Sequence, residues 1–388
     1  MLRVVNYGAA CAVIETGGTR ILCDPWFSTG IYLGAWQRED YIPDPLTTIG
    51  LCDYIYISHL HPDHFDPAFL RYYLTAYPTA KVWISTHCKH LIRMTAEFKP
   101  LIANSLSHGK WIATIIPNHG YEADCNIDTA LVVADQDSAV VNLNDNPFDA
   151  KQVERVNAMT AGKHVTALLP YTGAGPWPQC YHMTHIERYA AAREKKNKFL
   201  DQFTRYKFAL RADVAVPFSA GYILRGPLAA LNKDRGIPEL YEVPEATLLP
   251  VTGAVQRRPE VFSGFTWESD PEPTNETIER LIQQASERAP KVDGKPLTIQ
   301  LDWGHGSAYV DCTYGDAPTA HETIIVHPKL LVRLLDGRAH FNDLEISSHP
   351  KIIRHGAAYD HRVFDYLLRF QARLSANLIT TADKLVCK

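Results

Sequence analysis

The stretch Ser58-His59-Leu60-His61-Pro62-Asp63-His64 places three imidazoles and a carboxylate within six positions. It follows Tyr54-Ile55-Tyr56-Ile57, a continuous run of apolar and aromatic residues that is typical of a buried strand. Side chains two positions apart on an extended chain point to the same side, so His59 and His61 can face one point. Asp63 and His64 lie where the chain must turn, and they can approach that point from another direction. One loop can therefore offer ligands to two adjacent metal ions, and these donors suit zinc, iron or manganese.

Length and composition indicate an ordinary globular protein with more than one domain. The chain has 388 residues, 46% of them hydrophobic and 21% charged, and this length favours two or three domains. The formal net charge of -4 gives no electrostatic reason to expect nucleic acid or an anionic membrane as a partner. No apolar run reaches the ~18–20 residues of a membrane-spanning helix, and the first residues lack the apolar core of a secretory signal. We therefore expect a cytoplasmic protein.

The cysteines give no sign of a disulfide framework or of an iron–sulfur cluster. All eight are scattered along the chain, and none forms a Cys-x-x-Cys pair. This spacing favours reduced, mostly buried thiols. The sequence also lacks Cys-x-His with a Cys-x-x-His partner, which is the pattern that holds a Rieske cluster.

Three regions are expected along the chain. Short β-like runs alternate with turns up to about residue 150, and helices dominate from about 151 to 235. Thr184 and Glu187 form a capping box at the start of a long helix that runs to about Leu210. The predicted organisation is a metal-binding catalytic domain at 1–240, a Pro/Gly-rich linker or excursion at 241–273, and a smaller α+β region at 274–388. This last region could cap a pocket or form a dimer surface. Within it, His340-Phe341-Asn342-Asp343 shows no ligand spacing and is interpreted as structural.

Further candidate ligands follow other predicted strands. Asp24, His119 and Asp145 each come at the end of a strand-like run. His182 and His185 follow the Pro/Gly-rich stretch at 169–176. Because loops at one edge of a sheet converge in space, all of these side chains can reach the His59 loop.

This order of ligands resembles the metallo-β-lactamase fold superfamily, which implies an αββα sandwich with two metal ions at one edge. The resemblance implies that one metal is held by His59, His61 and His119. The second would be held by Asp63, His64 and a last histidine, for which His182 is favoured over His185 because it precedes the helix cap. Asp145 would bridge the two metals, Asp63 and Asp145 would be the catalytic carboxylates, and Asp24 would orient the histidine loop.

A more specific resemblance covers residues 1 to 235. The segments Asn142-Leu143-Asn144-Asp145-Asn146, Thr172-Gly173-Ala174-Gly175-Pro176-Trp177-Pro178 and Pro217-Phe218-Ser219-Ala220-Gly221-Tyr222 look like parts of the CMP-N-acetylneuraminate hydroxylase catalytic domain. This resemblance implies iron-dependent oxygenation. That hydroxylase carries its own Rieske domain, whereas this chain begins directly at the first strand of the sandwich. Electrons are therefore expected from a separate ferredoxin or reductase.

Two enzyme functions are expected from these patterns, with two transition-metal ions as cofactors and a small molecule as substrate. The first is a non-haem diiron monooxygenase, because mixed imidazole and carboxylate ligands suit iron in two oxidation states. The alternative is a zinc or manganese hydrolase that acts on an amide, lactone, thioester or phosphodiester, since two metals about 3.5–4 Å apart activate water. A third reading is a binding protein that keeps the fold without the chemistry.

Five aromatic residues belong to segments that flank the metal loop in this fold. They could line a substrate pocket or form ordinary aromatic core, and both interpretations stay open at this point. These residues are Tyr171, Trp177, Tyr181, Phe218 and Tyr222.

Overall fold

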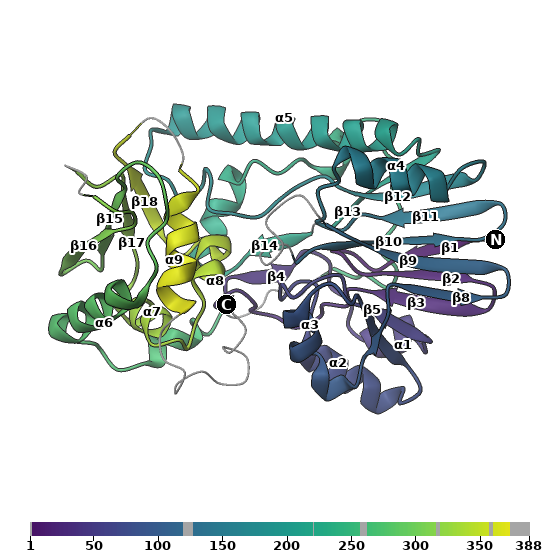
Figure 1. Cartoon of the computed structure of the whole chain (residues 1–388), viewed down its shortest axis with the longest axis horizontal. Coiled ribbons are helices and arrows are strands. Elements are labelled where there is room, and N and C mark those ends of the chain that lie inside the picture. Colours follow the sequence, from purple (N-terminus) through teal and green to yellow (C-terminus); the bar gives the residue numbers. More distant parts are fainter. Residues whose placement is uncertain are drawn as a thin grey trace.

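The computed structural model describes residues 2–118, 127–219, 221–256, 262–315, 319–356 and 360–372. Two six-stranded sheets dominate its N-terminal part (Figure 1). In the order of hydrogen-bonded neighbours, the first sheet contains β1 (Arg3–Asn6), β2 (Ala12–Thr16), β3 (Thr19–Cys23), β5 (Tyr54–Tyr56), β6 (Lys81–Ile84) and β7 (Leu101–Ile102). The second contains β13 (Val214–Phe218), β12 (His164–Pro170), β11 (Ser138–Asn142), β10 (Thr129–Ala134), β9 (Trp111–Pro117) and β8 (Ser105–His108).

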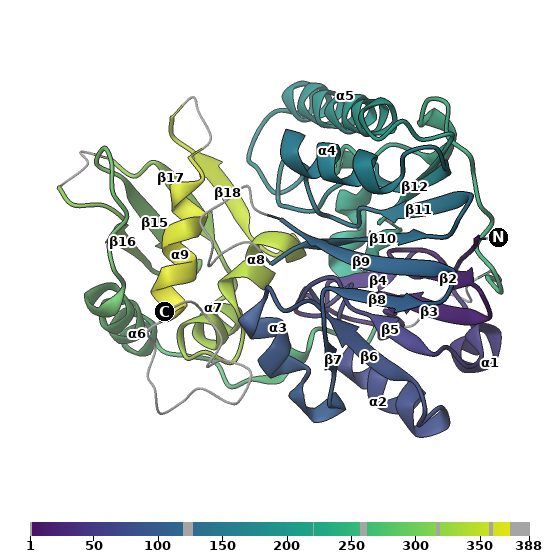
Figure 2. The ribbon, with the colours of Figure 1, turned by 45° about the vertical axis from the view of Figure 1, so that its right-hand side comes forward.

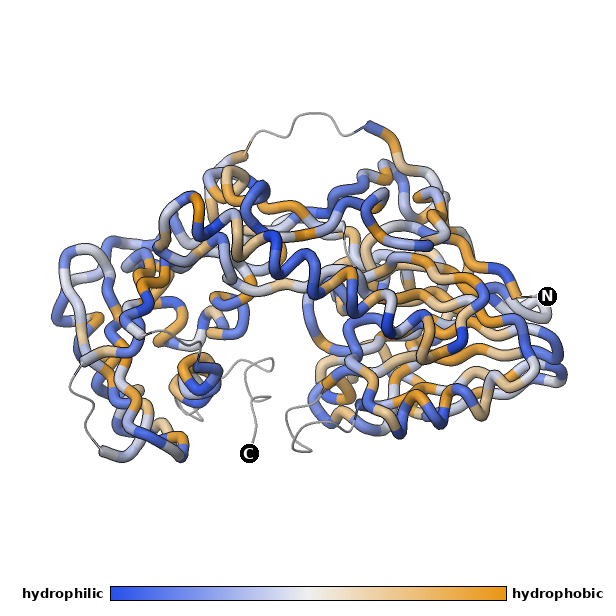
Figure 3. Tube along the Cα trace, turned by 90° about the horizontal axis from the view of Figure 1, so that it is seen from above, coloured by the Kyte–Doolittle hydropathy of each residue, from blue (hydrophilic) through white to orange (hydrophobic). Residues whose placement is uncertain are grey.

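The two sheets pack face to face because their strands alternate between two apolar faces. On β2, Ile14 packs between the sheets, whereas Val13 packs on the outer side with Phe69 and Tyr73 of α2 (Pro67–Ala76). On β10, Leu131 likewise faces the first sheet, and its neighbours in sequence face the helices outside. Such alternation is the period-2 pattern of strands that are buried on both faces. Figure 3 shows the strands of the sandwich as mainly hydrophobic.

Helices cover the outer faces of both sheets, so the architecture is the predicted αββα sandwich. The first sheet carries α1 (Pro45–Ile49), α2 and α3 (Lys89–Met94), with a short 3-10 turn at Ala96–Phe98. The second sheet packs against α4 (Ala150–Met159) through Val156 and against α5 (His185–Ala209) through Phe203. The predicted capping box at the start of α5 is present, because Thr184 accepts from the backbone N–H of Glu187 and Glu187 accepts from that of Thr184.

Parallel strand pairs bring the ends of distant segments to one edge of the sandwich. β3 and β5 run parallel with Cys23 opposite Tyr56, so Asp24 and the loop after β5 leave the sheet side by side. β11 and β12 are also parallel, with Asn142 opposite Leu168, and Asp145 follows β11 at the same edge. The carboxyl ends of these strands therefore position the candidate ligands.

The C-terminal region has its own sheet and its own apolar core. Its strands lie in the order β16 (Ser307–Asp311), β15 (Thr298–Asp302), β17 (Glu322–Ile325) and β18 (Lys351–Arg354). Around them pack α6 (Asn275–Arg288), α7 (Pro328–Leu335), α8 (Phe341–Ser347) and α9 (Arg362–Ala372). Figures 1 and 2 show this region beside the sandwich, and in Figure 1 α5 runs along the top of the sandwich toward this region. The last helix of the described residues is α9, and residues 357–359 and 373–388 lie outside them.

Between these parts the chain forms short elements. β4 (Trp36–Arg38) pairs with β14 (Tyr222–Leu224), and 3-10 turns lie at Gly226–Asp234, Leu240–Glu242 and Thr266–Ser269. Phe265 and Trp267, within the segment predicted as a linker, pack into the core of the C-terminal region. The boundaries at 240 and 274 stay a prediction.

Two expectations about thiols and membranes can be compared with the described residues. Their six cysteines are all free and buried. None of their helices combines the length and the apolar character that crossing a membrane requires.

Candidate metal centre

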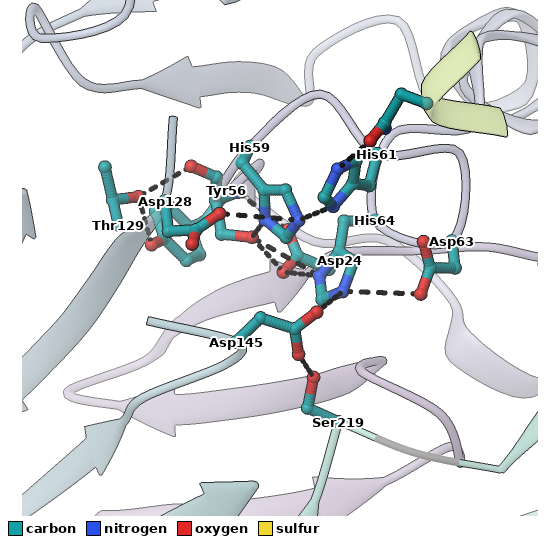
Figure 4. A network of polar contacts seen from close by, with 12 residues as sticks. Asp24, Tyr56, His59, His61, Asp63, His64, Asp128, Thr129, Asp145 and Ser219 are labelled. Carbon is teal, nitrogen blue, oxygen red and sulfur yellow. Dashed lines mark hydrogen bonds and ion pairs between the residues drawn. The ribbon is translucent and has the colours of Figure 1, made fainter. Parts of the chain in front are cut away.

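The loop after β5 gathers its imidazoles around one point (Figure 4). The His59 ring is fully buried, and its Nε2 lies 2.8 Å from Nδ1 of His61. The ring of His64 lies 4.1 Å from that of His59, measured between centroids. With Asp63 and Asp145, these histidines form two groups of three possible ligands, and the donor atoms within each group lie within 4.8 Å of one another. One group is His59, His61 and Asp145; the other is Asp63, His64 and Asp145.

Asp24 anchors this loop through hydrogen bonds to Ser58 and His64. It is fully buried at the end of β3, and its backbone has a φ of 41°, a left-handed conformation that Asp tolerates better than most residues. One carboxylate oxygen accepts from the backbone N–H of Ser58 at 2.7 Å, and the other lies 2.8 Å from Nδ1 of His64. This contact turns Nε2 of His64 toward the remaining carboxylates, 3.6 Å from Asp63 and 3.3 Å from Asp145. Asp24 therefore lies where an orienting residue is expected.

Asp145 is common to both groups. It follows β11, its side chain is 38% exposed, and one oxygen faces His64. Its other oxygen accepts a short hydrogen bond from the hydroxyl of Ser219, at the end of β13. A carboxylate that belongs to two neighbouring groups of ligands is suited to bridge two cations.

The charges at the centre are strongly coupled. Burial lowers the pKa of His59 well below its ordinary value, and the neighbouring imidazoles of His64 and His61 lower it further. Burial also acts to lower the pKa of His64, but the carboxylates of Asp145 and Asp63 outweigh it, and the pKa is held well above its ordinary range. Burial would raise the pKa of Asp145, yet His64 keeps it low. The cluster thus combines the neutral imidazole of His59 with the ionised carboxylate of Asp145, which are protonation states that metal binding needs, whereas a cation bound at His64 would displace its proton.

Asp128 is a further carboxylate of the centre that the sequence did not reveal. It immediately precedes β10, and its Oδ1 lies 3.8 Å from Nε2 of His59. Burial raises its pKa to about 6, and Asp145 contributes to that increase. The hydroxyl of the next residue, Thr129, donates to the carbonyl of Ser58 at 2.7 Å and so fixes the start of β10 beside the histidine loop. The signal in the sequence was only positional, since an antiparallel strand begins at the edge where its partner ends.

The described residues fit a pair of transition-metal ions. Imidazole nitrogens and carboxylate oxygens converge in two groups that share one carboxylate, and Asp128 adds another oxygen next to the first group. Two imidazoles in contact at 2.8 Å can share only one proton between the facing nitrogens, whereas a cation would satisfy both lone pairs. Such a donor set is chemically suited to iron, zinc or manganese.

The predicted ligand His119 lies outside the described residues. The residue before it, Asn118, is buried, and its backbone N–H donates to the carbonyl of Asp128 at 3.1 Å. The role of His119 as a ligand stays a prediction.

The structure does not bring His182 into either group. His182 is exposed, and its backbone N–H donates to the carbonyl of Ile352 on β18 at 2.7 Å. The preceding Tyr181 forms a β-bridge to the same residue. This pairing fixes the segment against the C-terminal sheet, and the alternative ligand, His185, is likewise exposed there at the start of α5. The prediction rested on the distance to the helix cap, which does not indicate the sheet that the segment joins.

The five predicted pocket aromatics separate in the same way. Tyr222 lines a cavity beside the metal centre and stacks on Trp36 with 3.4 Å between ring centroids. Phe218 packs between the two sheets, and Tyr171 packs beneath α5 with the core of the second sheet. Trp177 and Tyr181 pack against the C-terminal core instead. All five thus pack in apolar clusters, and Tyr222 also lines the cavity; a role in substrate binding stays a prediction.

The cavity beside the centre has one aromatic and one polar wall. Trp26, Trp36 and Tyr222 form the first, and Asp63, His64 and Asp145 belong to the second. The cavity measures about 30 Å³, which is room for about two water molecules.

Comparison with known proteins agrees with this architecture. Residues 3–142 match a sequence model described as a beta-lactamase superfamily domain. The chain has the metallo-β-lactamase fold. The matched residues include the His59 loop, and the two sheets with their outer helices are the layers of that fold.

Curated relatives of this metallo-β-lactamase-fold protein come from mycobacteria. A protein named "Putative Rieske 2Fe-2S iron-sulfur protein" from Mycobacterium tuberculosis H37Rv is 29% identical over 262 residues, which is 61% of this chain and 47% of the relative. One with the same name from Mycolicibacterium smegmatis is 30% identical over 250 residues, with the same coverage. The chain thus spans about half the length of the curated relatives it matches.

Solved structures of two chemical classes resemble the chain at a distance. The diiron β-hydroxylase CmlA from Streptomyces venezuelae has a TM-score of 0.38 at 16% identity, over 61% of this chain and 47% of that one. Isothiocyanate hydrolase from Delia radicum gut bacteria has a TM-score of 0.43 at 14% identity, over 66% of this chain and 99% of that one.

Proposed function

We propose that this protein is a dinuclear metal enzyme, specifically a non-haem diiron monooxygenase that hydroxylates a small molecule with dioxygen and external electrons. The observation that carries the proposal is the donor set: His59, His61 and His64 converge with three carboxylates, those of Asp63, Asp145 and Asp128. A set this rich in carboxylate oxygen favours a metal that changes oxidation state within mixed nitrogen and oxygen ligands, and iron is such a metal.

The residues of the chain would divide the work as follows. Asp145 would help to hold both cations, and Asp24 would keep His64 in the tautomer whose Nε2 faces the other carboxylates. Trp26, Trp36 and Tyr222 would exclude water and hold an apolar part of the substrate beside the centre. Bound iron would supply the activation of dioxygen, which no side chain of the site can provide.

The names of the relatives support an electron-transfer partner. Hydroxylation with dioxygen requires two electrons from outside, and the mycobacterial relatives are named as Rieske iron–sulfur proteins. A Rieske cluster carries one electron at a time. A separate ferredoxin or reductase would serve this chain, and the sequence resemblance to the CMP-N-acetylneuraminate hydroxylase catalytic domain points to the same chemistry.

A hydrolase is the second candidate, and the small cavity favours it. About two water molecules fit beside Asp63 and Asp145, where a water activated by two metals would lie. An amide, lactone, thioester or phosphodiester would then be the substrate, with zinc or manganese as the metal.

Anaerobic reconstitution separates the two functions. The metal-free full chain is loaded with two equivalents of Fe(II) or of Zn(II), and both forms are assayed for oxygen consumption with a chemical reductant and for hydrolysis of model esters, lactones and phosphodiesters. We expect Mössbauer spectra of a coupled iron pair after exposure to air, and oxygen consumption by the iron form alone. A zinc form that hydrolyses these substrates, with an iron form that consumes no oxygen above the level of free iron, would reverse the order of the two proposals.

A further inference from the structure

The C-terminal region approaches the metal centre through α8 and the residues that follow it. In Figure 4 the yellow-green ribbon of this region lies beside His61. The contact is direct, because the side-chain nitrogen of Asn342 on α8 lies 3.4 Å from Nε2 of His61. The other ring nitrogen of His61 faces His59 at 2.8 Å. Both nitrogens of His61 thus have a neighbour, and one neighbour comes from the C-terminal region.

A second contact reaches the centre through Tyr32. Its ring is buried, and its hydroxyl donates to Oδ1 of Asp63 at 2.6 Å. This hydrogen bond leaves the other oxygen of Asp63 facing His64. Tyr32 therefore fixes the rotation of the carboxylate that belongs to the second ligand group.

The backbone that presents Tyr32 is in an unfavourable conformation. Tyr32 and Leu33 have φ values of 50° and 62°, and Gly34 follows at 88°. Two successive non-glycine residues in the left-handed region are conformationally unfavourable, so neighbouring structure must hold them there. The segment would otherwise relax and withdraw the hydroxyl from Asp63.

The C-terminal region, together with Phe265 from the preceding segment that packs into its core, supplies the contacts that hold this segment. Nε2 of His349, just after α8, lies 3.2 Å from the carbonyl of Leu33. The ring of Phe265 lies so close to Gly34 that a Cβ atom at that position would be 3.0 Å from it. His349 and Phe265 also pack against each other, with 4.6 Å between ring centroids. Burial lowers the pKa of His349 to about 4, so the ring is neutral near pH 7 and carries one N–H for this contact.

We propose that the C-terminal region positions one ligand in each of the two metal groups. Asn342 holds His61 of the first group directly. Tyr32, which His349 and Phe265 hold in turn, fixes Asp63 of the second group. These four are positioning residues, because each acts through another side chain. The inference rests on the proposed dinuclear centre and goes beyond it, since it makes a region outside the matched superfamily domain a part of the active site.

Stepwise binding of Co(II) tests this proposal without any assay of activity. The metal-free full chain is titrated anaerobically with Co(II), and the visible absorption of each bound equivalent is recorded. The His61→Ala and Asp63→Ala variants assign each absorption band to one ligand group. Outer partners of metal ligands typically change metal affinity by about 10–100-fold. We expect Asn342→Ala to weaken the His61 group by that factor and Tyr32→Phe to weaken the Asp63 group, each with little effect on the other.

Asn275→Ala is the matched control for loss of an asparagine in the same region. Asn275 hydrogen-bonds with Trp303 and with the carbonyl of His305, and it belongs to neither ligand group. We expect this variant to bind both cations as the native chain does. His349→Ala should reproduce the selective effect of Tyr32→Phe, because both changes remove the hydrogen bond between the Tyr32 hydroxyl and Asp63.

Three outcomes would overturn the inference. If Asn342→Ala and Tyr32→Phe bind two cations with native affinity and spectra, the C-terminal contacts position nothing. If both affinities fall together and the thermal midpoint of the metal-free protein falls with them, the contacts are merely structural. If the native chain itself binds fewer than two Co(II) ions, the dinuclear centre fails, and this result is distinct from the first two.

Discussion

Two segments carried most of the candidate site residues, and the structure treats them differently. The loop from Ser58 to His64 gathers its side chains around one point, together with Asp24 and Asp145. The segment from Tyr171 to His185 instead leaves the sandwich, and Tyr181 forms a bridge with Ile352 of the C-terminal sheet. The candidate residues of the first segment thus lie in a ligand cluster, whereas those of the second lie where the chain contacts the C-terminal region.

The difference lies in what determines each location. The first loop follows β5, which pairs in parallel with β3, so the positions of its neighbours follow from local strand order. The second segment is placed by a pairing with a strand far away in the sequence, and its own residues carry no sign of that partner. Metal ligands at the ends of central strands can therefore be predicted from sequence more reliably than metal ligands in a long connection between elements.

Removal of the shared carboxylate should have the largest effect. Asp145→Ala takes one ligand from both groups, so we expect the affinity for both cations to fall by more than about 100-fold, beyond the loss that outer partners cause. Metal content after dialysis against a competing chelator measures the change. Asp137→Ala removes an exposed carboxylate from the turn between β10 and β11 and should leave both cations bound. Retention of two cations by Asp145→Ala would show that the loop after β5 holds them without help.

The next largest effect is expected at Asp24, which contacts the loop from Ser58 to His64. Asp24→Asn keeps the shape of the side chain but removes the charge that faces Nδ1 of His64. Metal affinity should fall by about 10–100-fold, and the free energy of unfolding of the metal-free protein should fall by roughly 1–3 kcal/mol because a buried donor loses its best acceptor.

Urea unfolding and chelator competition measure these two quantities for Asp24→Asn. The control is Asp213→Asn, because Asp213 also accepts from a backbone N–H, that of Val165 at 2.7 Å, while its side chain is half exposed. Equal losses in the two variants would mean that Asp24 acts as a general structural acceptor rather than through His64.

The free energy of unfolding is expected to depend on pH through a carboxyl group of the C-terminal region. Burial raises the pKa of Asp343, on α8, to about 7, whereas the unfolded chain has the ordinary value near 4. A raised pKa in the folded state means that stability is fully present below about pH 4 and is lost as the pH rises through 7. Asp343→Asn should remove this loss, so the variant should gain up to about 4 kcal/mol over the native chain above pH 7, and little near pH 4.

Urea unfolding of the metal-free protein at several pH values between 4 and 8 tests the role of Asp343. Asp336→Asn, at the C-terminal end of α7, where the partly buried carboxylate is paired with Arg338, is the control and should leave the profile unchanged. Parallel profiles for the native chain and Asp343→Asn would show that the carboxyl ionises freely in the folded state.

The smallest effect is expected at the residue that the sequence favoured as the last ligand. His182 is exposed, and its link to β18 runs through its backbone N–H. His182→Ala should therefore keep both cations and change the free energy of unfolding by no more than about 0.5 kcal/mol. Loss of one cation in this variant would mean that the segment reaches the centre in the metal-loaded protein.

Much of the fold followed from patterns within the sequence. The apolar run from Tyr54 to Ile57 predicted the buried strand β5, and Thr184 with Glu187 predicted the start of α5. These signals are local, because burial on a strand and capping of a helix depend on neighbouring residues.

The rest of the site depends on contacts between distant elements. Asp128 joins the cluster only because β10 begins beside the loop after β5. Asn342 was interpreted as structural, since no spacing in the sequence shows that α8 docks against His61. Trp177 and Tyr181 are core residues of a region whose packing no local pattern reveals.

Anomalous X-ray diffraction from crystals of the full chain loaded with iron tests the central proposal most directly. We expect two iron peaks about 3.5–4 Å apart, with Asp145 in contact with both, His61 and Asp63 on different ions, and His182 bound to neither. A single peak, or peaks at residues other than the loop after β5, would contradict the dinuclear centre.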